Sequence, residues 1–200
     1  MKSLSHFLPL LAAFLAMATV SSARADSIVL GGGCFWCMDA AFKLLPGVTR
    51  VTCGYAGGTT PNPTYEEVCT ETTGYAEVVK VVYDPAKVSL RQVLAYFWES
   101  HDPTQVGGQG DDLGDQYRSI ILYANPIQKA AAEASRAEAQ TQFSAPITTQ
   151  IVPLKKFWRA EEYHQDYFEK HPDRAYCSLV IRPKVRKLQH LLAEEKKNKS

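Results

Sequence analysis

The residues with the clearest chemistry are two cysteines that follow a glycine-rich segment, in the order Gly31-Gly32-Gly33-Cys34-Phe35-Trp36-Cys37. A cysteine placed where such a turn enters a helix meets unpaired backbone N–H groups and the positive end of the helix dipole. Both features favour the thiolate, which is the nucleophilic form of cysteine. The pattern therefore indicates Cys34 as a nucleophile. The alternative is that Cys34 is a small buried side chain at the start of a helix.

Cys34 and Cys37 also form a C-x-x-C pair, which has two further interpretations. One is a thioredoxin-like dithiol. The other is half of a zinc site, but the sequence contains neither a second C-x-x-C pair nor an H-x₃₋₅-H pair. We therefore predict no metal site.

Glu77 is a second candidate for chemistry. It falls in a predicted strand over residues 75–83, on the same face as Val79, Val81 and Tyr83. A carboxyl group on an apolar face has a raised pKa and can act as a neutral acid near pH 7. The alternative is a glutamate at the strand end that faces solvent.

The elements that must position these residues alternate between strands and helices, which favours an α/β fold. Thr64 with Glu67, and Ser89 with Gln92, have the spacing of capping boxes and predict two helix starts. Residues 101–116 form a long predicted loop, and a loop of this length in a compact domain is usually functional or disordered. The predicted strands are 27–30, 48–55, 75–83, 119–123 and 148–154. The predicted helices are 35–45, a short one from Thr64, one from Ser89, 125–142, 157–170 and 185–198.

The composition is that of a globular protein with one domain. The 200 residues are 46% hydrophobic and carry a formal net charge of +1. This balance argues against nucleic acid or an anionic membrane surface as the main partner, because both require a basic excess. The five cysteines are an odd number, so at least one thiol stays free or reactive.

Residues 1–25 have the pattern of a secretory signal peptide. A basic residue, Lys2, precedes an apolar run from Phe7 to Val20, and Ala23-Arg24-Ala25 matches an A-x-A cleavage site. The run is short for a membrane span, which needs about 20 residues. We expect an exported protein, periplasmic or secreted, with a mature domain over residues 26–200 and no membrane segment after cleavage. The alternative is an N-terminal anchor that is never cut.

Six motifs together resemble the peptide methionine sulfoxide reductase A family, and they occur in its order and spacing from about residue 27 to 184. They are Gly32-Gly33-Cys34-Phe35-Trp36, Gly54-Tyr55-Ala56-Gly57-Gly58, Asn62-Pro63-Thr64-Tyr65, His101-Asp102-Pro103-Thr104-Gln105, Gly114-Asp115-Gln116-Tyr117-Arg118-Ser119 and His164-Gln165-Asp166-Tyr167. The resemblance implies a two-layer α+β sandwich in which a mixed sheet has a ferredoxin-like core. It implies a single domain with no metal and no bound cofactor.

The resemblance also implies roles for individual residues. Cys34 matches the family's nucleophile and Glu77 its acid. Tyr65, Asp112 and Tyr117 match the polar groups around the sulfoxide oxygen and the substrate. Phe35 and Trp36 match the apolar pocket for the S-methyl group.

This assignment implies the activity of a peptide-methionine (S)-S-oxide reductase, acting on methionine-S-sulfoxide that is free or in oxidised proteins. A sulfoxide oxygen leaves only when it is protonated, so an acid is needed beside the attacking thiol. The nucleophile would become a sulfenic acid, a second thiol would convert it to a disulfide, and a thioredoxin-like reductant would restore it. We expect a monomer. The alternative is an exported thioredoxin-like exchange protein that uses Cys34 and Cys37.

The resolving thiol has two candidates, Cys37 and Cys177. Cys37 lies one helical turn from Cys34, but its predicted helix faces the core. Cys177 follows a turn-like segment, residues 171–176, and some family members resolve with a cysteine at about this point. We predict a Cys34–Cys177 disulfide, with Cys37 as the alternative and with Cys53 and Cys69 as packed bystanders.

Two departures from the family pattern bear on the site. Asp39 stands where the family usually has Glu, which leaves its role open. Gly107, Gly108 and Asp111 also differ from the commoner residues of the long loop.

Overall fold

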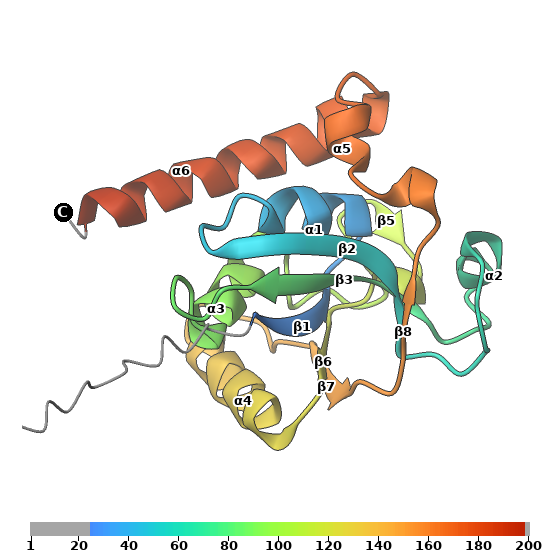
Figure 1. Cartoon of the computed structure of the whole chain (residues 1–200), viewed down its shortest axis with the longest axis horizontal. Coiled ribbons are helices and arrows are strands. Elements are labelled where there is room, and N and C mark those ends of the chain that lie inside the picture. Colours follow the sequence, from blue (N-terminus) through green and yellow to red (C-terminus); the bar gives the residue numbers. More distant parts are fainter. Residues whose placement is uncertain (1–24, 199–200) are drawn as a thin grey trace, which may run out of the picture.

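The computed structural model describes residues 25–198, and strands and helices alternate as predicted over residues 26–100 (Figure 1). The predicted signal peptide therefore lies almost wholly outside the described residues. The strands are β1 (Asp26–Gly31), β2 (Val48–Ala56), β3 (Ala76–Tyr83), β4 (Gly108–Gln109), β5 (Asp112–Leu113), β6 (Ile120–Tyr123), β7 (Gln150–Pro153) and β8 (Phe157–Arg159). The α-helices are α1 (Phe35–Phe42), α2 (Tyr65–Cys69), α3 (Leu90–Ser100), α4 (Pro126–Gln140), α5 (Tyr167–Lys170) and α6 (Arg182–Asn198).

The central sheet has six strands in the order β7-β6-β1-β3-β2-β8. All neighbouring pairs are antiparallel except β6 and β7, which are parallel. Within it, β6-β1-β3-β2 is the core, with α1 connecting β1 to β2 and α3 connecting β3 to β6. This is the split β-α-β arrangement of a ferredoxin-like fold. The predicted mixed sheet with a ferredoxin-like core is confirmed.

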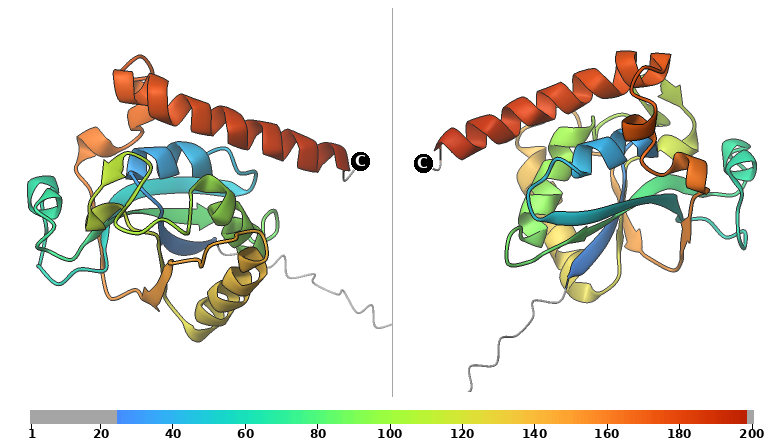
Figure 2. Two further views of the ribbon diagram at one scale, coloured as in Figure 1. Left: turned by 180° about the vertical axis from the view of Figure 1, so that it is seen from behind. Right: turned by 45° about the horizontal axis from the view of Figure 1, so that its top comes forward.

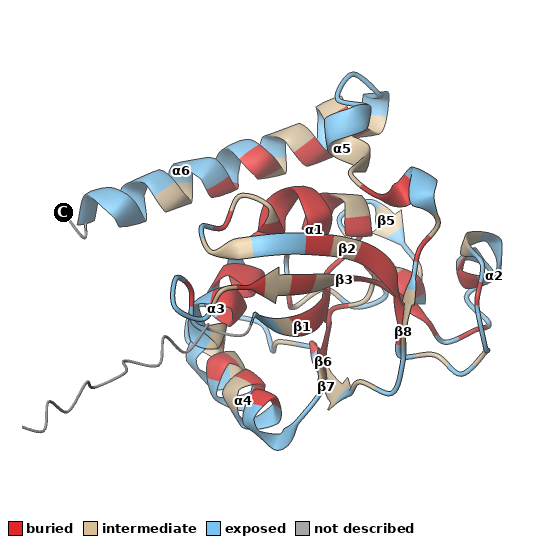
Figure 3. Cartoon of the chain, viewed as in Figure 1, coloured by how far each residue is buried: buried red, intermediate tan, exposed pale blue. Residues whose placement is uncertain are grey.

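The helices pack on one face of this sheet. The main core joins strand residues such as Leu30 and Val81 to Met38 of α1, Phe97 of α3 and Leu188 of α6. Figure 3 shows this burial along α1 and β3. In the views of Figures 1 and 2, α6 lies on the outer side of α1, away from the sheet.

The opposite face of the sheet carries a smaller core. Val78 and Ile120 are buried there, and Val152, Leu154 and Phe157 pack against them. No helix of this chain covers the small core among the described residues, so the architecture is two layers with the larger core between sheet and helices.

Capping explains where two of the helices begin. The Thr64 hydroxyl accepts from the backbone N–H of Glu67, and the Glu67 carboxylate accepts from the backbone N–H of Thr64. Ser89 and Gln92 make the same reciprocal pair at the start of α3. Both predicted capping boxes are confirmed, because their geometry depends only on residues three apart.

The predicted helix over residues 157–170 is wrong. The segment forms strand β8, a 3₁₀ turn at Glu162–His164 and then the four-residue helix α5. Phe157 and Trp158 have the aromatic side chains that favour strands, and the edge of β2 offers them backbone partners. Gly54 makes this pairing possible, because a Cβ there would lie 2.4 Å from the Phe157 ring.

The predicted long loop contains a small β-hairpin, β4–β5, followed by a 3₁₀ turn at Asp115–Tyr117. Gly107, Gly110 and Gly114 have φ values of 72°, 61° and 129°, which favour glycine at these corners. The hairpin brings Asp112 toward the helix layer, where its carboxylate accepts a hydrogen bond from Tyr176 of the C-terminal segment.

The C-terminal helix begins earlier than predicted. A π-helical turn, Cys177–Ile181, precedes α6 and runs into it. The predicted turn is present at residues 172–174, but Cys177 itself is buried in helical backbone. Of the residues 25–198, no helix is long and apolar enough to cross a membrane.

Candidate active site

Cys34 lies where the glycine-rich turn enters α1, as the sequence predicts. It occupies the N-cap position of α1 and is buried. Gly33 before it has φ 95°, and a Cβ there would lie 2.8 Å from the Gln109 side chain. The Gly33 N–H also donates to the Tyr117 carbonyl at 3.1 Å. The turn is therefore held tightly against the 101–118 segment, and a bulkier residue would displace Cys34.

Glu77 lies in β3 beneath the first turn of α1. Its Oε2 accepts a 2.9 Å hydrogen bond from the Phe35 backbone N–H, and the residue is only 1% exposed. Burial raises the pKa of its carboxyl to about 8, although the Phe35 N–H lowers it. Glu77 is therefore mostly neutral near pH 7, so it can donate a proton. The predicted burial of Glu77 on the apolar face is confirmed.

A pocket of about 230 Å³ brings seven of the predicted site residues together, whereas Cys37 and Cys177, the two candidates for the resolving thiol, do not line it. It is lined by Cys34, Phe35, Trp36, Tyr65, Glu77, Asp112, Tyr117 and Tyr176. Seven of these eight were predicted, and they come from α1, α2, β3, β5 and the turns between them. A larger pocket of about 430 Å³ lies elsewhere, beside Lys43 and Arg50, and contains no cysteine.

Tyr176 is the lining residue that the sequence did not predict. Its hydroxyl donates to Asp112 Oδ2 at 2.6 Å and lies 3.7 Å from the Cys37 sulfur. It connects the C-terminal segment to the hairpin and to α1. The available signal was its position directly before Cys177, but nothing in the neighbouring sequence distinguishes it from the other tyrosines of the chain.

Tyr65 and Tyr117 line the pocket, and each carries a phenol hydroxyl group. Burial raises the pKa of each phenol, and the negative charge of Glu77 raises both further. Both hydroxyls therefore keep their protons throughout the neutral range. They can donate hydrogen bonds to an oxygen atom bound between them.

The Cys34 thiol differs from the prediction in its ionisation. Burial raises its pKa well above the ordinary value, and Cys37 and the charge of Glu77 add to this effect. The first amide of α1 donates to Glu77 and is therefore not directed at the Cys34 thiol. Cys34 is therefore a thiol at neutral pH before substrate binds.

Cys37 has the opposite shift. A hydrogen bond from Cys34 lowers its pKa to about 7, and the charge of Lys184 and the Tyr176 hydroxyl contribute, against the effect of burial. Burial raises the pKa of Cys177. Of the two thiols considered for resolution, Cys37 is the more acidic.

The two predicted bystander cysteines differ from each other. Cys53 is fully buried, and its sulfur donates to the Phe35 carbonyl at 3.6 Å. Cys69 is exposed, so the prediction that it is packed is wrong. Cys69 interacts with the Tyr65 hydroxyl one turn earlier in α2. Burial is the larger cause of the raised pKa of Tyr65, and this hydrogen bond with Cys69 adds to it.

Trp36 is held by two aromatic residues. Its indole stacks on the Tyr167 ring, with centroids 3.7 Å apart and planes 5° apart. Its Nε1 donates to Nδ1 of His164 at 3.2 Å. Since Phe35 also packs on the His164 ring at 4.8 Å, the apolar wall of the pocket is anchored from the 162–167 segment.

None of the described residues forms a group of three or more His, Cys, Asp or Glu side chains arranged to hold a metal ion. The reactive groups that line the pocket are the Cys34 thiol, the carboxyl groups of Glu77 and Asp112, and tyrosine hydroxyls. This set can attack an electrophilic sulfur atom and protonate an oxygen bound to it.

Comparisons with known proteins agree with this chemistry. Residues 26–197 match the family model described as peptide methionine sulfoxide reductase. A peptide methionine sulfoxide reductase MsrA of Haloquadratum walsbyi is 50% identical over 170 residues, which is 85% of this chain and 98% of that protein. The Thermus thermophilus MsrA is 51% identical over 158 residues, covering 79% of this chain and 90% of that protein.

Solved structures give the same result. Mxr1 from Saccharomyces cerevisiae in reduced form has a TM-score of 0.73 and 34% identity, over 78% of this chain and 91% of that chain. Methionine sulfoxide reductase A of Corynebacterium diphtheriae has a TM-score of 0.68 and 39% identity, over 74% and 76% of the two chains. Mxr1 in complex with Trx2 has a TM-score of 0.54 and 25% identity, over 76% and 91%.

Proposed function

Because the chain belongs to the peptide methionine sulfoxide reductase family, it reduces methionine sulfoxide to methionine with thiols, and we propose that it does so in the pocket of Cys34 and Glu77. One observation carries this proposal. A neutral buried carboxyl group lines the same small pocket as the thiol, between aromatic walls. A protein that only exchanges thiols and disulfides needs no such acid.

In the first step the Cys34 sulfur attacks the sulfur of the sulfoxide. This attack forms a bond between the two sulfur atoms. The sulfur–oxygen bond of the substrate and the new sulfur–sulfur bond then break as the protonated oxygen is transferred to Cys34, which leaves a sulfenic acid and the sulfide. A thiol plus a sulfoxide contain the same atoms as a sulfenic acid plus a sulfide. The step is therefore balanced, with methionine reduced by two electrons and Cys34 oxidised by two.

Glu77 supplies the proton that makes the oxygen labile. Tyr65 and Tyr117 donate hydrogen bonds to the same oxygen, which disperses its negative charge. Because Cys34 is a thiol before attack, it releases a proton as its sulfur becomes bonded. That proton restores Glu77, and no net proton is consumed.

Phe35 and Trp36 form the wall for the S-methyl group. A methyl group leaves water favourably when it enters an aromatic pocket. With the methyl group on this wall and the oxygen toward Glu77 and Tyr117, only one configuration at sulfur leaves the sulfur facing Cys34. We assign this configuration to methionine-S-sulfoxide, free or in oxidised proteins.

The catalytic cycle closes when a second thiol attacks the sulfenic acid. Water leaves, a disulfide forms, and an external dithiol reduces it by exchange. A thioredoxin-like protein is the reductant that we propose, and the complex of Mxr1 with Trx2 supports it. We also propose that the active unit is a monomer.

We also propose that the protein acts outside the cytoplasm. The basic start, apolar run and A-x-A pattern of residues 1–25 support export of the domain over residues 26–200. Its reductant would then be an exported thioredoxin-like protein in the periplasm or outside the cell.

The test of the proposed function uses dithiothreitol and the two epimers of methionine sulfoxide. Turnover of the S epimer alone is the expected result, and Cys34→Ser should abolish it. The alternative, an exported thiol–disulfide exchange protein that uses Cys34 and Cys37, predicts insulin reduction without turnover of either epimer.

A further inference from the structure

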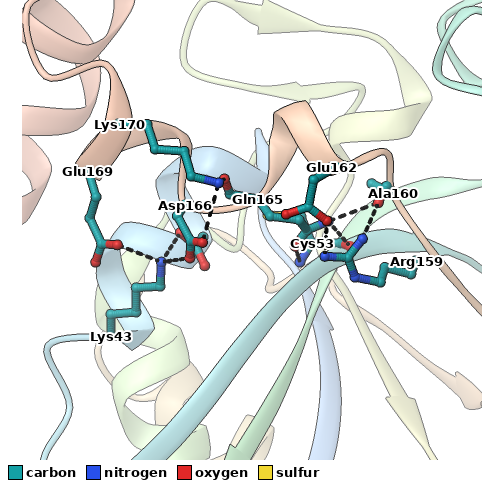
Figure 4. A network of polar contacts seen from close by, with 10 residues as sticks. Lys43, Cys53, Arg159, Ala160, Glu162, Gln165, Asp166, Glu169 and Lys170 are labelled. Atoms are coloured by element: carbon teal, nitrogen blue, oxygen red, sulfur yellow. Dashed lines mark hydrogen bonds and ion pairs between the residues drawn. The ribbon is translucent and has the colours of Figure 1, made fainter.

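Asp39 and Lys43 lie outside the pocket, at the far end of the helix that begins with Cys34. Lys43 Nζ lies 2.9 Å from Asp39 and 3.3 Å from Glu169, and it also donates to the Asp166 carboxylate. We call Asp39, Lys43, Asp166 and Glu169 the α1–α5 brace. Figure 4 shows the contacts of Lys43 with Asp166 and Glu169, which belong to the neighbouring segment.

The segment on the other side of the brace carries the residues that hold Trp36. His164 and Tyr167 both contact the indole, and Gln165 and Asp166 lie between them. The Gln165 amide bonds the backbone N–H and carbonyl of Cys53, each at 3.0 Å. This amide pair fixes one point of the segment on β2.

The next residue has an unfavourable conformation. Asp166 has φ 59°, in the left-handed region that few residues other than glycine adopt. This turn directs its carboxylate to Lys43 and starts α5 at Tyr167, the residue that stacks on Trp36. Because α5 has only four residues, it has little stability of its own and depends on such contacts.

Helix α1 is therefore connected to the 162–170 segment at both ends. At its N-terminal end Trp36 contacts Tyr167 and His164, and at its C-terminal end Lys43 contacts Asp166. Asp39 is 2% exposed and faces Lys43 one turn away. A buried ion pair contributes little net stability by itself, so its main effect is to fix geometry.

We propose that Asp39 and Lys43 are positioning residues that hold Trp36 in place through Asp166 and Tyr167 and thereby set the affinity of the pocket for the sulfoxide substrate. This inference rests on the proposed function, in which Trp36 is part of the wall for the S-methyl group. It assigns a role to Asp39, which the sequence left open. The brace touches no reacting atom, so its loss changes binding and leaves the rate of the chemical step unaltered.

The test is single-turnover kinetics with N-acetylmethionine S-sulfoxide on the full domain, for Asp39→Asn and Lys43→Met. The substrate concentration that gives half the maximal rate should rise roughly tenfold, in the range typical of coupling between contacting residues, while the maximal rate stays within about twofold. Asp39→Glu keeps the carboxylate and should restore the wild-type concentration. Lys129→Met removes the exposed pair with Glu133 on α4 and is the matched control.

Two further measurements separate positioning from general loss of stability. In a Trp36→Phe background, Asp39→Asn should raise the half-saturating concentration no further, because both changes act through the same indole. For each protein, subtracting the emission spectrum of its Trp36→Phe counterpart isolates the fluorescence of Trp36. This Trp36 emission should shift in Asp39→Asn but not in Lys129→Met. This optical signal reports on Trp36 even if the pocket reduces no sulfoxide, so failure of the brace and failure of the proposed function are distinguishable.

Three results would overturn the proposal. The first is a half-saturating concentration in Asp39→Asn and Lys43→Met equal to that of wild type. The second is an additional effect of Asp39→Asn in the Trp36→Phe background. The third is a drop in maximal rate with unchanged half-saturation, which would place the brace in the chemical step.

Discussion

The backbone N–H of Phe35 donates a 2.9 Å hydrogen bond to Oε2 of Glu77, so the first amide of α1 faces a carboxyl group and not the Cys34 thiol. The positive end of the helix therefore partly stabilises a charge on Glu77. Cys34, at the N-cap beside it, keeps a raised pKa. At this one end of α1, the backbone amide therefore interacts with the acid, Glu77, and not with the nucleophile, Cys34.

The first prediction concerns the ionisation of Cys34. Its alkylation by iodoacetamide should have a midpoint above 9.0, the ordinary thiol pKa, whereas Cys37 should have a midpoint at about 7. Glu77→Gln removes the negative charge that raises the Cys34 pKa, so its midpoint should fall. Fragment mass spectrometry separates the two cysteines. A Cys34 midpoint that does not move in Glu77→Gln would contradict this relationship.

The second prediction concerns proton donation by Glu77. Glu77→Gln keeps a hydrogen-bonding group but has no acidic proton, so single-turnover reduction should slow by roughly 10²–10⁴-fold, as is typical of a general acid. Rapid quench with the S epimer measures this rate. The slowing should occur although the same change lowers the Cys34 pKa, and Glu133→Gln on the exposed face of α4 is the control. A full single-turnover rate in Glu77→Gln would show that another group is the acid.

The third prediction is a Cys34–Cys177 disulfide after one turnover, with recycling by a thioredoxin-like reductant lost in Cys177→Ser and the first turnover kept. Cys177 is buried in the π-helical turn before α6, so this disulfide requires that turn to open. Disulfide formation should therefore be slower than oxygen transfer, and amide exchange over residues 177–181 should increase in the oxidised protein. Peptide mapping decides the assignment. A Cys34–Cys37 disulfide with Cys177 still open to alkylation would show that Cys177 is not the resolving thiol.

The fourth prediction concerns stability in acid. Burial lowers the pKa of His101 to about 4, although its hydrogen bond with the Phe97 carbonyl opposes the shift. Below about pH 6.5 His101 binds a proton in the unfolded chain but not in the folded protein. The free energy of unfolding therefore decreases as the pH falls toward 4. Unfolding in urea should show that the stability advantage of wild type over His101→Gln shrinks by about 3 kcal/mol between these pH values. An advantage that is constant with pH would mean that His101 titrates normally.

The fifth prediction concerns export. Protein recovered from cells should begin at Asp26, because Ala23-Arg24-Ala25 matches the pattern that a signal peptidase cleaves. Intact-mass measurement of the soluble fraction checks this directly. Recovery of soluble protein that still carries residues 1–25 would count against the signal peptide. Ala23→Lys should prevent cleavage and is the internal control.

The sequence alone determined most of the local structure. The capping boxes at Thr64 and Ser89, the Val-rich strand that holds Glu77, and the glycine turn before Cys34 each depend on residues close together in the chain. Such signals do not require knowledge of the rest of the fold. The motifs also identified seven of the eight residues that line the pocket.

Other features were decided only by the tertiary structure. The stripe of apolar residues over 157–170 has helical spacing, yet pairing with the edge of β2 makes its first part a strand. Tyr176 enters the pocket only because the C-terminal segment lies against α1 and the hairpin that carries Asp112. Neither contact has a signature in the neighbouring sequence.

The ionisation of the site shows the same division. Sequence placed Cys34 at a helix start, which by itself favours the thiolate. Folding buried that thiol, placed Glu77 from β3 on the first amide of α1, and thereby raised the pKa of Cys34. The physical reason is that a pKa depends on solvent exclusion and on charges within a few ångströms, and the fold here brings the Glu77 carboxyl to Phe35, which is 42 positions away in the sequence.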